Sequence, residues 1–126
     1  MLLNNNKMML IYGFDAKDRY TLDNIIKKAK LPSYRVVDKT MAKMTVKNML
    51  DGLRFELGNI TVPDERVILF NNFSDYEIDI AINLIKDSLE TMPIFAAVTP
   101  MSINWEFNYL LNHLVEEREW HKKHQG

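Results

Sequence analysis

Residues 67–75 read VILFNNFSD, and this stretch decides the fold that the rest of the chain is expected to adopt. Its four leading apolar residues are typical of a strand that is buried on both faces. The polar residues that follow, ending in Ser74 and Asp75, mark a turn that enters a helix. The stretch therefore predicts a buried strand whose carboxyl end leads into a helix.

A second stretch, LIYGFD at residues 10–15, has the same organisation. Gly13 suits a tight turn because glycine tolerates positive φ angles, and Asp15 stands where a helix N-cap is needed. The apolar spacing of residues 22–29 and 78–89 predicts one amphipathic helix after each strand. The two stretches thus predict two strand-turn-helix units.

Strands and helices alternate along the chain. We expect strands at residues 8–12, 34–37, 67–70 and 93–98, helices at about 16–30, 41–53, 74–89 and 100–120, and a long loop at 55–66 with at most a strand fragment at 60–62. This alternation predicts the α/β class, as a single three-layer domain with about four helices and a four-stranded, mainly parallel sheet. Right-handed crossovers would place helices on both faces. The domain is expected to span residues 8–120, with frayed termini at 1–7 and 121–126.

Two segments of the chain are similar to each other when they are aligned so that Leu10 falls on Leu69. We call this match the internal alignment. Six identical pairs then align over 33 positions without a gap, namely Leu10/Leu69, Phe14/Phe73, Asn24/Asn83, Ile26/Ile85, Lys27/Lys86 and Thr40/Thr99. A tandem βαβα repeat and a merely shared architecture both explain this similarity. Both favour the strand order 2-1-3-4, in which the turns at 13–15 and 71–74 line one crevice at the carboxyl ends of the strands. The uncharged strand at 94–98 would then form an edge, which is normally hidden.

Size and composition exclude several classes of protein. The 126 residues suit one globular domain, and the formal net charge of -1 gives no field that would attract nucleic acid or a membrane surface. The chain has no Cys, so it has no disulfide and no thiolate nucleophile. No leader pattern or membrane-spanning apolar run is present, and we therefore expect a cytoplasmic protein.

Polar residues and one Trp follow the expected strands. The candidate ligand-binding residues at this rim are Gly13, Asp15, Asn71, Asn72, Ser74, Thr99, Ser102, Asn104 and Trp105. Structural roles compete with binding: Asp15, Ser74 and Thr99 suit helix caps, the two Asn suit a turn, and Trp105 suits core packing. No catalytic residue is assigned.

The sequence favours no cofactor and no metal. Gly13 stands alone in its turn, which disfavours phosphate binding by a glycine-rich loop, and no Ser lies in a nucleophile elbow. His121 and His124 have a spacing that two metal ligands can share, but a solvated helix end explains them better.

The sequence resembles a family of small bacterial proteins known only as a domain of unknown function. The similarity lies in residues 12–14, 34–37, 67–75 and 94–105, the last of which read IFAAVTPMSINW. The resemblance implies no activity. In this family a Gly commonly stands where this chain has Asn72, which implies a turn with a positive φ angle there. A Thr usually stands where this chain has Met101, so a role that depends on that hydroxyl is not expected here.

Three functions follow from these patterns. The leading expectation is a non-catalytic binding or regulatory module whose rim receives a small polar ligand or a protein partner. An alternative is a small enzyme in which Asp15 or Asp75 acts as an acid or base at the crevice. A further alternative is a homodimer that pairs through residues 94–98 or through the last helix.

Overall fold

The structure is a computed structural model, and it describes residues 6–56, 58 and 60–124. The chain forms two compact units, which are described separately. The sheet unit comprises Met1–Val37 and Glu65–Val98, and the helical unit comprises Asp38–Asp64 and Thr99–Gly126. The extent of a single domain over residues 8–120 stays a prediction.

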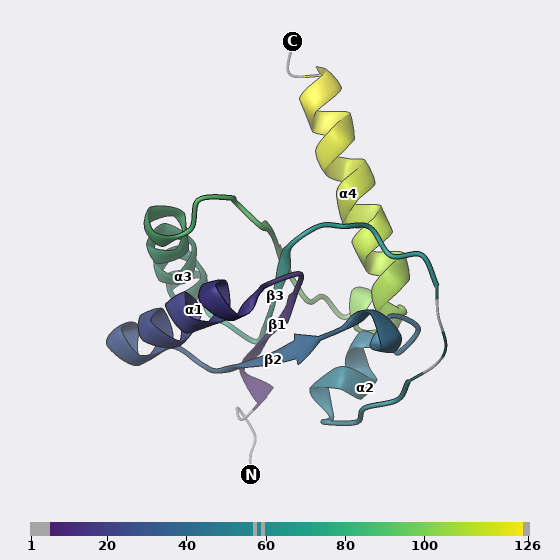
Figure 1. The fold of residues 1–126 in the computed structure, drawn as a ribbon, viewed down its shortest axis with the longest axis horizontal. Helices are drawn as coiled ribbons and strands as arrows, with labels where there is room; N and C mark the ends of the chain where they lie inside the picture. The colour runs from purple at the N-terminus through teal and green to yellow at the C-terminus, as the bar shows by residue number, and fades with distance from the viewer. Residues whose placement is uncertain (1–5, 57, 59, 125–126) are drawn as a thin grey trace. The chain divides into compact units, whose positions relative to one another are not determined.

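The sheet unit has four strands and two helices (Figure 1). They are β1 (Met8–Tyr12), α1 (Ala16–Ala29), β2 (Tyr34–Val37), β3 (Val67–Asn71), α3 (Asp75–Ser88) and β4 (Ile94–Ala97). The strand order is β2-β1-β3-β4, as predicted. β1 pairs with β2 in parallel and β3 pairs with β4 in parallel, so the α/β class and the mainly parallel sheet are confirmed.

The central pair of strands corrects the sequence prediction. β1 and β3 run antiparallel, with Leu10 opposite Leu69. Residues 38–66 connect β2 to β3, and a connection of this length can return the chain to either end of a sheet. The local sequence of β3 therefore does not fix its direction.

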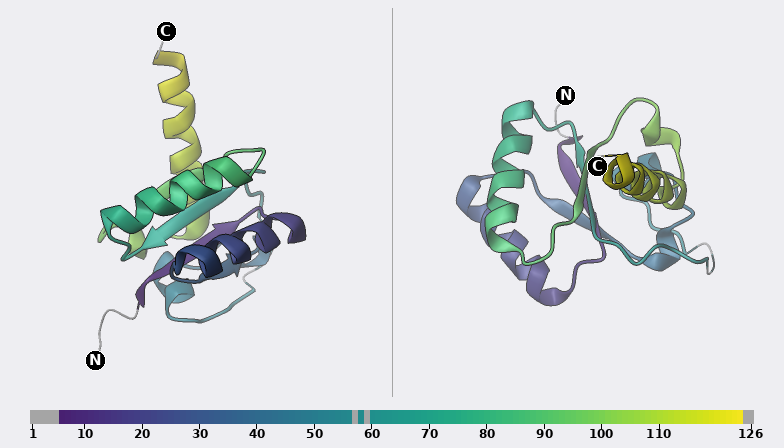
Figure 2. Two further views of the ribbon diagram at one scale, coloured as in Figure 1. Left: turned by 90° about the vertical axis from the view of Figure 1, so that its left-hand side faces the viewer. Right: turned by 90° about the horizontal axis from the view of Figure 1, so that it is seen from above.

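The direction of β3 also decides where the crossover helices lie. Two right-handed crossovers that leave antiparallel neighbours toward opposite edges place their helices on the same face. Accordingly, α1 and α3 share one core with alternate residues of the central strands. The core includes Leu22 and Ile85 from the two helices and Ile11 and Ile68 from the two strands. Figure 2, left, shows both helices in front of the strands. The prediction that these helices cover opposite faces is wrong.

Local signals explain the bounds of both helices. Asp15 caps α1 by accepting a hydrogen bond from the Asp18 N–H group, and α1 ends at Lys30 in the left-handed conformation. Ser74 and Glu77 form the predicted capping box at the start of α3. The strand β3 is buried at every position, as its continuous apolar run predicts.

The internal alignment carries β1 onto β3 and α1 onto α3, with both bounds of each element coinciding. Because Leu10 lies opposite Leu69, an approximate two-fold axis passes between these residues, and Met8 and Tyr12 face Asn71 and Val67 across it. The two halves of the sheet unit are thus structural repeats.

In its described residues, the helical unit contains two short 3₁₀ segments and two helices. They are η2 (Lys39–Met41), α2 (Val46–Leu50), η3 (Ser102–Asn104) and α4 (Phe107–His124). The unit is held together by an antiparallel bridge between Thr45 and Glu106, flanked by the Val46 N–H group donating to the Trp105 carbonyl. The loop at 55–66 contains no strand in its described residues.

Two helices differ from their predicted bounds: the one predicted at 41–53 is shorter at both ends, and the one predicted at 100–120 begins later. The pattern at 41–53 resolves into η2 and the short helix α2. The last helix begins at Phe107, because Trp105 is extended (φ -83°, ψ 150°) and takes part in the bridge described above. That helix continues to His124, through residues that the sequence suggested to be frayed. None of the helices in the described ranges has the length and apolar character needed to cross a membrane.

Candidate functional site

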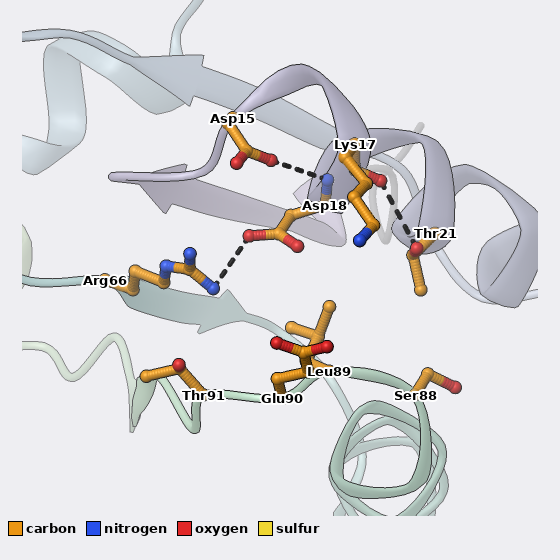
Figure 3. Close-up of a pocket in the computed structure, with 9 residues that line it drawn as sticks. All are labelled: Asp15, Lys17, Asp18, Thr21, Arg66, Ser88, Leu89, Glu90 and Thr91. Carbon is orange, nitrogen blue, oxygen red and sulfur yellow. Dashed lines mark hydrogen bonds and ion pairs between the residues drawn. The ribbon is translucent and has the colours of Figure 1, made fainter.

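A pocket of about 180 Å³ opens in the sheet unit, where β1 ends and β3 begins (Figure 3). One wall is the first turns of α1, a second is Arg66 just before β3, and a third is residues 88–91 after α3. Apart from Leu89, all of the lining residues are polar or charged. The lining of the pocket is therefore predominantly polar.

The first turns of α1 supply Asp15, Lys17, Asp18 and Thr21 to the pocket. The Asp15 carboxylate accepts a hydrogen bond of 2.8 Å from the Asp18 N–H group, which fixes the start of the helix. The Thr21 hydroxyl donates to the Lys17 carbonyl oxygen at 3.3 Å. Because Lys17 and Thr21 are one helical turn apart, their side chains lie on the same face of the helix.

Arg66 joins the start of β3 to α1. Its Nη1 atom lies 2.7 Å from Asp18 Oδ2, and its guanidinium carbon lies 5.9 Å from the centre of the Phe14 ring. Asp18 Oδ2 is buried and accepts no hydrogen bond from the described residues, so Arg66 compensates its charge through the ion pair.

Residues 88–91 form the wall opposite α1 because the second half of the sheet unit has a longer connection. Met9 pairs with Tyr34, and the internal alignment carries these two residues onto Ile68 and Pro93. Ile68 pairs instead with Phe95, two positions beyond Pro93. The chain after α3 accordingly leaves in an extended conformation at Leu89 (φ -105°, ψ 142°). This longer connection between α3 and its strand builds the wall.

The ion pair beside the pocket has a counterpart at the opposite end of the sheet. The internal alignment carries Lys7 onto Arg66 and Asp18 onto Glu77. Lys7 Nζ lies 3.0 Å from Glu77 Oε1. In both halves, therefore, the residue before the central strand forms an ion pair with the third residue of a helix of the other half. Since both ends have this ion pair, it belongs to the repeated fold and not to the pocket alone.

Most of the remaining pocket residues have no such counterpart. At equivalent positions, Lys17, Thr21 and Ser88 are replaced by Tyr76, Ile80 and Ala29, whereas Asp15 and its equivalent Ser74 are both helix N-caps. The same scaffold thus forms with mostly less polar residues at its other end. Helix α1 does not need Lys17 and Thr21 in order to form, because the equivalent helix α3 forms with Tyr76 and Ile80 at the same positions.

Gly13 and Asp15 lie at the pocket end of the sheet. Gly13 has a φ angle of +84°, and a Cβ atom there would lie 2.3 Å from the carbonyl oxygen of Glu65. Its role is to let two segments of backbone pass closely. Of the residues predicted to bind a ligand, Asp15 alone lines this pocket.

Asn71, Asn72 and Ser74 lie at the opposite end of the sheet, because β3 is antiparallel to β1. The buried Asn71 amide donates to the Asn6 carbonyl oxygen at 2.6 Å. Asn72 has a φ angle of +61°, as the resemblance implied, and Ser74 caps α3. Each of the three residues thus has a structural role.

The antiparallel pair also removes the predicted crevice between the turns at 13–15 and 71–74. Asp15 and Asp75, proposed as acids or bases at that crevice, follow the carboxyl ends of antiparallel strands and lie at opposite ends of the sheet. Moreover, the Asp15 carboxylate accepts a hydrogen bond from the Asp18 N–H group at the start of α1. These two carboxylates therefore cannot act as a pair.

Thr99, Ser102, Asn104 and Trp105 belong to the helical unit. Thr99 and Ser102 cap each other, since each hydroxyl oxygen accepts from the other residue's N–H group, at 2.9 and 3.0 Å. Trp105 is half-buried and makes an edge contact of 4.9 Å with the Tyr109 ring. Asn104 is exposed. Ligand binding by these residues stays a prediction.

Four of the described titratable groups outside the pocket have shifted pKa values. One is Glu119, whose pKa is lowered by its hydrogen bond with Arg118, and the other three follow. The Ser74 N–H group, and after it Lys7, lowers the pKa of Glu77. Burial, together with the hydrogen bond to Asp23, raises the pKa of Tyr34 to about 12. The Thr40 hydroxyl lowers the pKa of Asp38. The last three shifts arise from contacts that stabilise the fold.

The described ranges contain no group of three or more His, Cys, Asp or Glu side chains able to hold a metal ion. His121 and His124 instead contact the Trp120 ring, with centroid distances of 5.3 and 4.1 Å.

Sequence reasoning missed most of the pocket. Lys17, Arg66, Glu90 and Thr91 line it, and none of them follows the carboxyl end of a strand directly. One signal could have found them. The internal alignment matches β1 with β3 and α1 with α3, but β4 pairs two positions later than β2 does, which indicates two extra residues in the connection that contains residues 88–91. Recognising that signal required the observed strand pairing.

Residues 66–120 match the model of a family described as Domain of unknown function (DUF3783). For these residues the predicted resemblance to a family of unknown function is confirmed. The match begins at Arg66 and runs through β3, α3, β4 and most of α4, so it covers the second of the two halves that the internal alignment relates. The searches of curated proteins and of solved structures gave no match.

Proposed function

We propose that this protein is a non-catalytic binding module whose sheet unit receives a small polar ligand in the pocket between α1 and residues 88–91. The main observation is that the two ends of the sheet unit, which have the same fold, carry different side chains. Both ends have the helix-strand ion pair, whereas Lys17, Thr21 and the wall at 88–91 occur at one end. Residues that a scaffold does not need are candidates for binding.

The pocket is a better supported site than the predicted rim residues. Asn71, Ser74, Thr99 and Ser102 use their polar groups in hydrogen bonds within the fold. In contrast, the Lys17 ammonium group and the Glu90 carboxylate make no hydrogen bond or ion pair with another described residue. The cytoplasmic location expected from the sequence belongs to the same proposal, and cell fractionation tests it.

The test uses the second half of the protein as its own control. The triple variant Asp15→Ser, Lys17→Tyr and Thr21→Ile gives α1 the residues that α3 carries at the same positions. We expect this variant to fold, because those residue types already occupy the equivalent helix. We further expect it to lose the thermal shifts and calorimetric heats that the unmodified protein gives with a library of polar metabolites.

The matched control is Tyr76→Lys, which changes the repeat of Lys17 at the other end of the sheet. Tyr76 is 73% exposed, so this control is expected to keep both the fold and the ligand response. Equal responses from the triple variant and the unmodified protein would reject the pocket as the site.

A second candidate function is pairing of two copies through β4. This strand is an edge of the sheet, and residues 93–98 carry no charge, whereas the other edge, β2, carries Arg35. An uncharged edge is an open template for another strand. Light scattering tests this function: we expect a dimer that Ala97→Lys disrupts and Val36→Lys, on the other edge, leaves intact. A monomer at high concentration removes this candidate. Pairing through α4 is tested in the same way with Trp120→Ala, which should disrupt a dimer that forms through this helix.

A further inference from the structure

Two groups of opposite charge border the pocket from facing walls. Lys17 extends its ammonium group from α1, and Glu90 extends its carboxylate from the segment that follows α3 (Figure 3). Both residues are exposed, and neither charged group is paired with another described residue. The charged groups that do pair, Arg66 and Asp18, satisfy each other.

The backbone adds to this separation of charge. The pocket lies at the N-terminus of α1 and at the C-terminus of α3, and both helices have the same length of 14 residues. The first N–H groups of a helix form a positive end and the last carbonyl groups form a negative end. On the α1 side, the Asp15 carboxylate already accepts a hydrogen bond from the first turn of the helix, so Lys17 is the unpaired positive group there. The negative end of α3 lies on the same side of the pocket as Glu90.

The opposite end of the sheet lacks this arrangement. There α3 begins and α1 ends, but Tyr76 replaces Lys17, and the C-terminus of α1 carries Lys27, Lys28 and Lys30. Those lysines neutralise the negative helix end, whereas the last turn of α3 carries one basic residue, Lys86. The charged groups at the pocket end therefore exceed what the repeated fold uses.

We propose that the pocket binds a small zwitterion, a molecule with a carboxylate and an ammonium group only a few bonds apart, as in a free amino acid. The carboxylate is directed to Lys17, and the ammonium group to Glu90 and the end of α3. The inference rests on the proposed binding function and specifies its ligand. A volume of about 180 Å³ corresponds to about six waters of about 30 Å³ each, which is room for a small amino acid.

A ligand of one charge is less suitable. An anion gains from Lys17 but is repelled by Glu90, and a cation meets the reverse. A zwitterion gains from both walls in a single orientation. The Thr91 hydroxyl, which also lines the pocket, is available to either end of the ligand.

Amide chemical shifts of the full chain, measured by NMR, test the proposal with three probes of known charge. The probes are glycine, acetate and methylammonium, each titrated to the same concentration at neutral pH. We expect glycine to shift the amides of residues 16–18 and 88–91, and to do so at about tenfold lower concentration than either singly charged probe.

Variants identify the two ends of the ligand. Lys17→Met and Glu90→Gln remove one charge each and are expected to weaken glycine binding about tenfold. Lys28→Met and Asp87→Asn remove charges from α1 and α3 outside the pocket lining and are expected to leave binding unchanged.

The outcomes separate this inference from the function beneath it. Acetate binding as tightly as glycine, with no effect of Glu90→Gln, would overturn the zwitterion and leave a binding pocket for anions. Silence with all three probes would also overturn it, and a response of the same amides to the metabolite library would then retain the binding function. Silence with the library as well would reject both.

Discussion

Leu10 lies directly opposite Leu69 in the antiparallel pair at the centre of the sheet, and these are the two residues that the internal alignment lays on each other. The same alignment relates α1 to α3 and the ion pair of Arg66 with Asp18 to that of Lys7 with Glu77. The pairing therefore lies on an approximate two-fold axis. Because of that axis, each residue near one end of the sheet has a natural control at the other.

The two ion pairs are expected to contribute unequally to stability. The side chains of Arg66 and Asp18 are 29% and 14% exposed, against 41% and 23% for Lys7 and Glu77. Arg66→Met leaves a largely buried carboxylate without its partner and should lower the free energy of unfolding by about 1–3 kcal/mol. Lys7→Met should cost less than about 1 kcal/mol. Urea denaturation of both variants measures the difference, and equal costs would contradict this prediction.

Gly13 is expected to resist substitution for a steric reason. In Gly13→Ala the new Cβ atom would meet the Glu65 carbonyl oxygen, in addition to the cost of a φ angle of +84°. Gly58 has a φ angle of +92°, and among the described residues no atom beyond Gly58 itself lies within 4 Å of the place a Cβ atom would take, so Gly58→Ala carries mainly the conformational cost. We expect Gly58→Ala to cost about 1 kcal/mol and Gly13→Ala at least about 1 kcal/mol more. Thermal unfolding of the two variants would refute this if their melting temperatures fell equally.

Asn72 is expected to act through its backbone conformation. Its φ angle is +61°, and the side chain is exposed. Asn72→Gly should change the free energy of unfolding by less than about 0.5 kcal/mol, and Asn72→Ala should lower it by about 1 kcal/mol, because alanine is strained in the left-handed region. Chemical denaturation distinguishes these values. A Gly variant as unstable as the Ala variant would show that the amide itself is needed.

Glu77 is expected to make stability depend on acid pH. Because the Ser74 N–H group and Lys7 hold its folded-state pKa below the ordinary 4.5, the unfolded chain takes up the proton first as the pH falls. The stabilisation by Glu77 is thus present at neutral pH and is lost as the pH falls from 4.5 through the folded-state pKa. Unfolding curves of the unmodified protein and Glu77→Gln should converge over that interval.

Glu116→Gln, which changes an exposed carboxylate of α4, is the control for this pH dependence. It should parallel the unmodified protein at each pH. If Glu77→Gln also paralleled the unmodified protein throughout, the capping box would not be the source of the effect.

The sequence by itself determined the elements of the sheet unit and their order. The apolar run before Asn71, the cap residues Asp15 and Ser74, and the helical spacing of apolar residues all act within a few positions of the chain. Such local signals give the bounds of strands and helices because the residues that decide them are near neighbours.

Only the tertiary structure decided the direction of β3, and with it the site. Whether Leu69 meets Leu10 in a parallel or an antiparallel ladder depends on contacts between distant segments, and both ladders satisfy the same apolar pattern. The antiparallel choice separates the turns at 13–15 and 71–74. It also brings Arg66 and residues 88–91 to α1, which is why the pocket could not be found from neighbouring residues in the sequence.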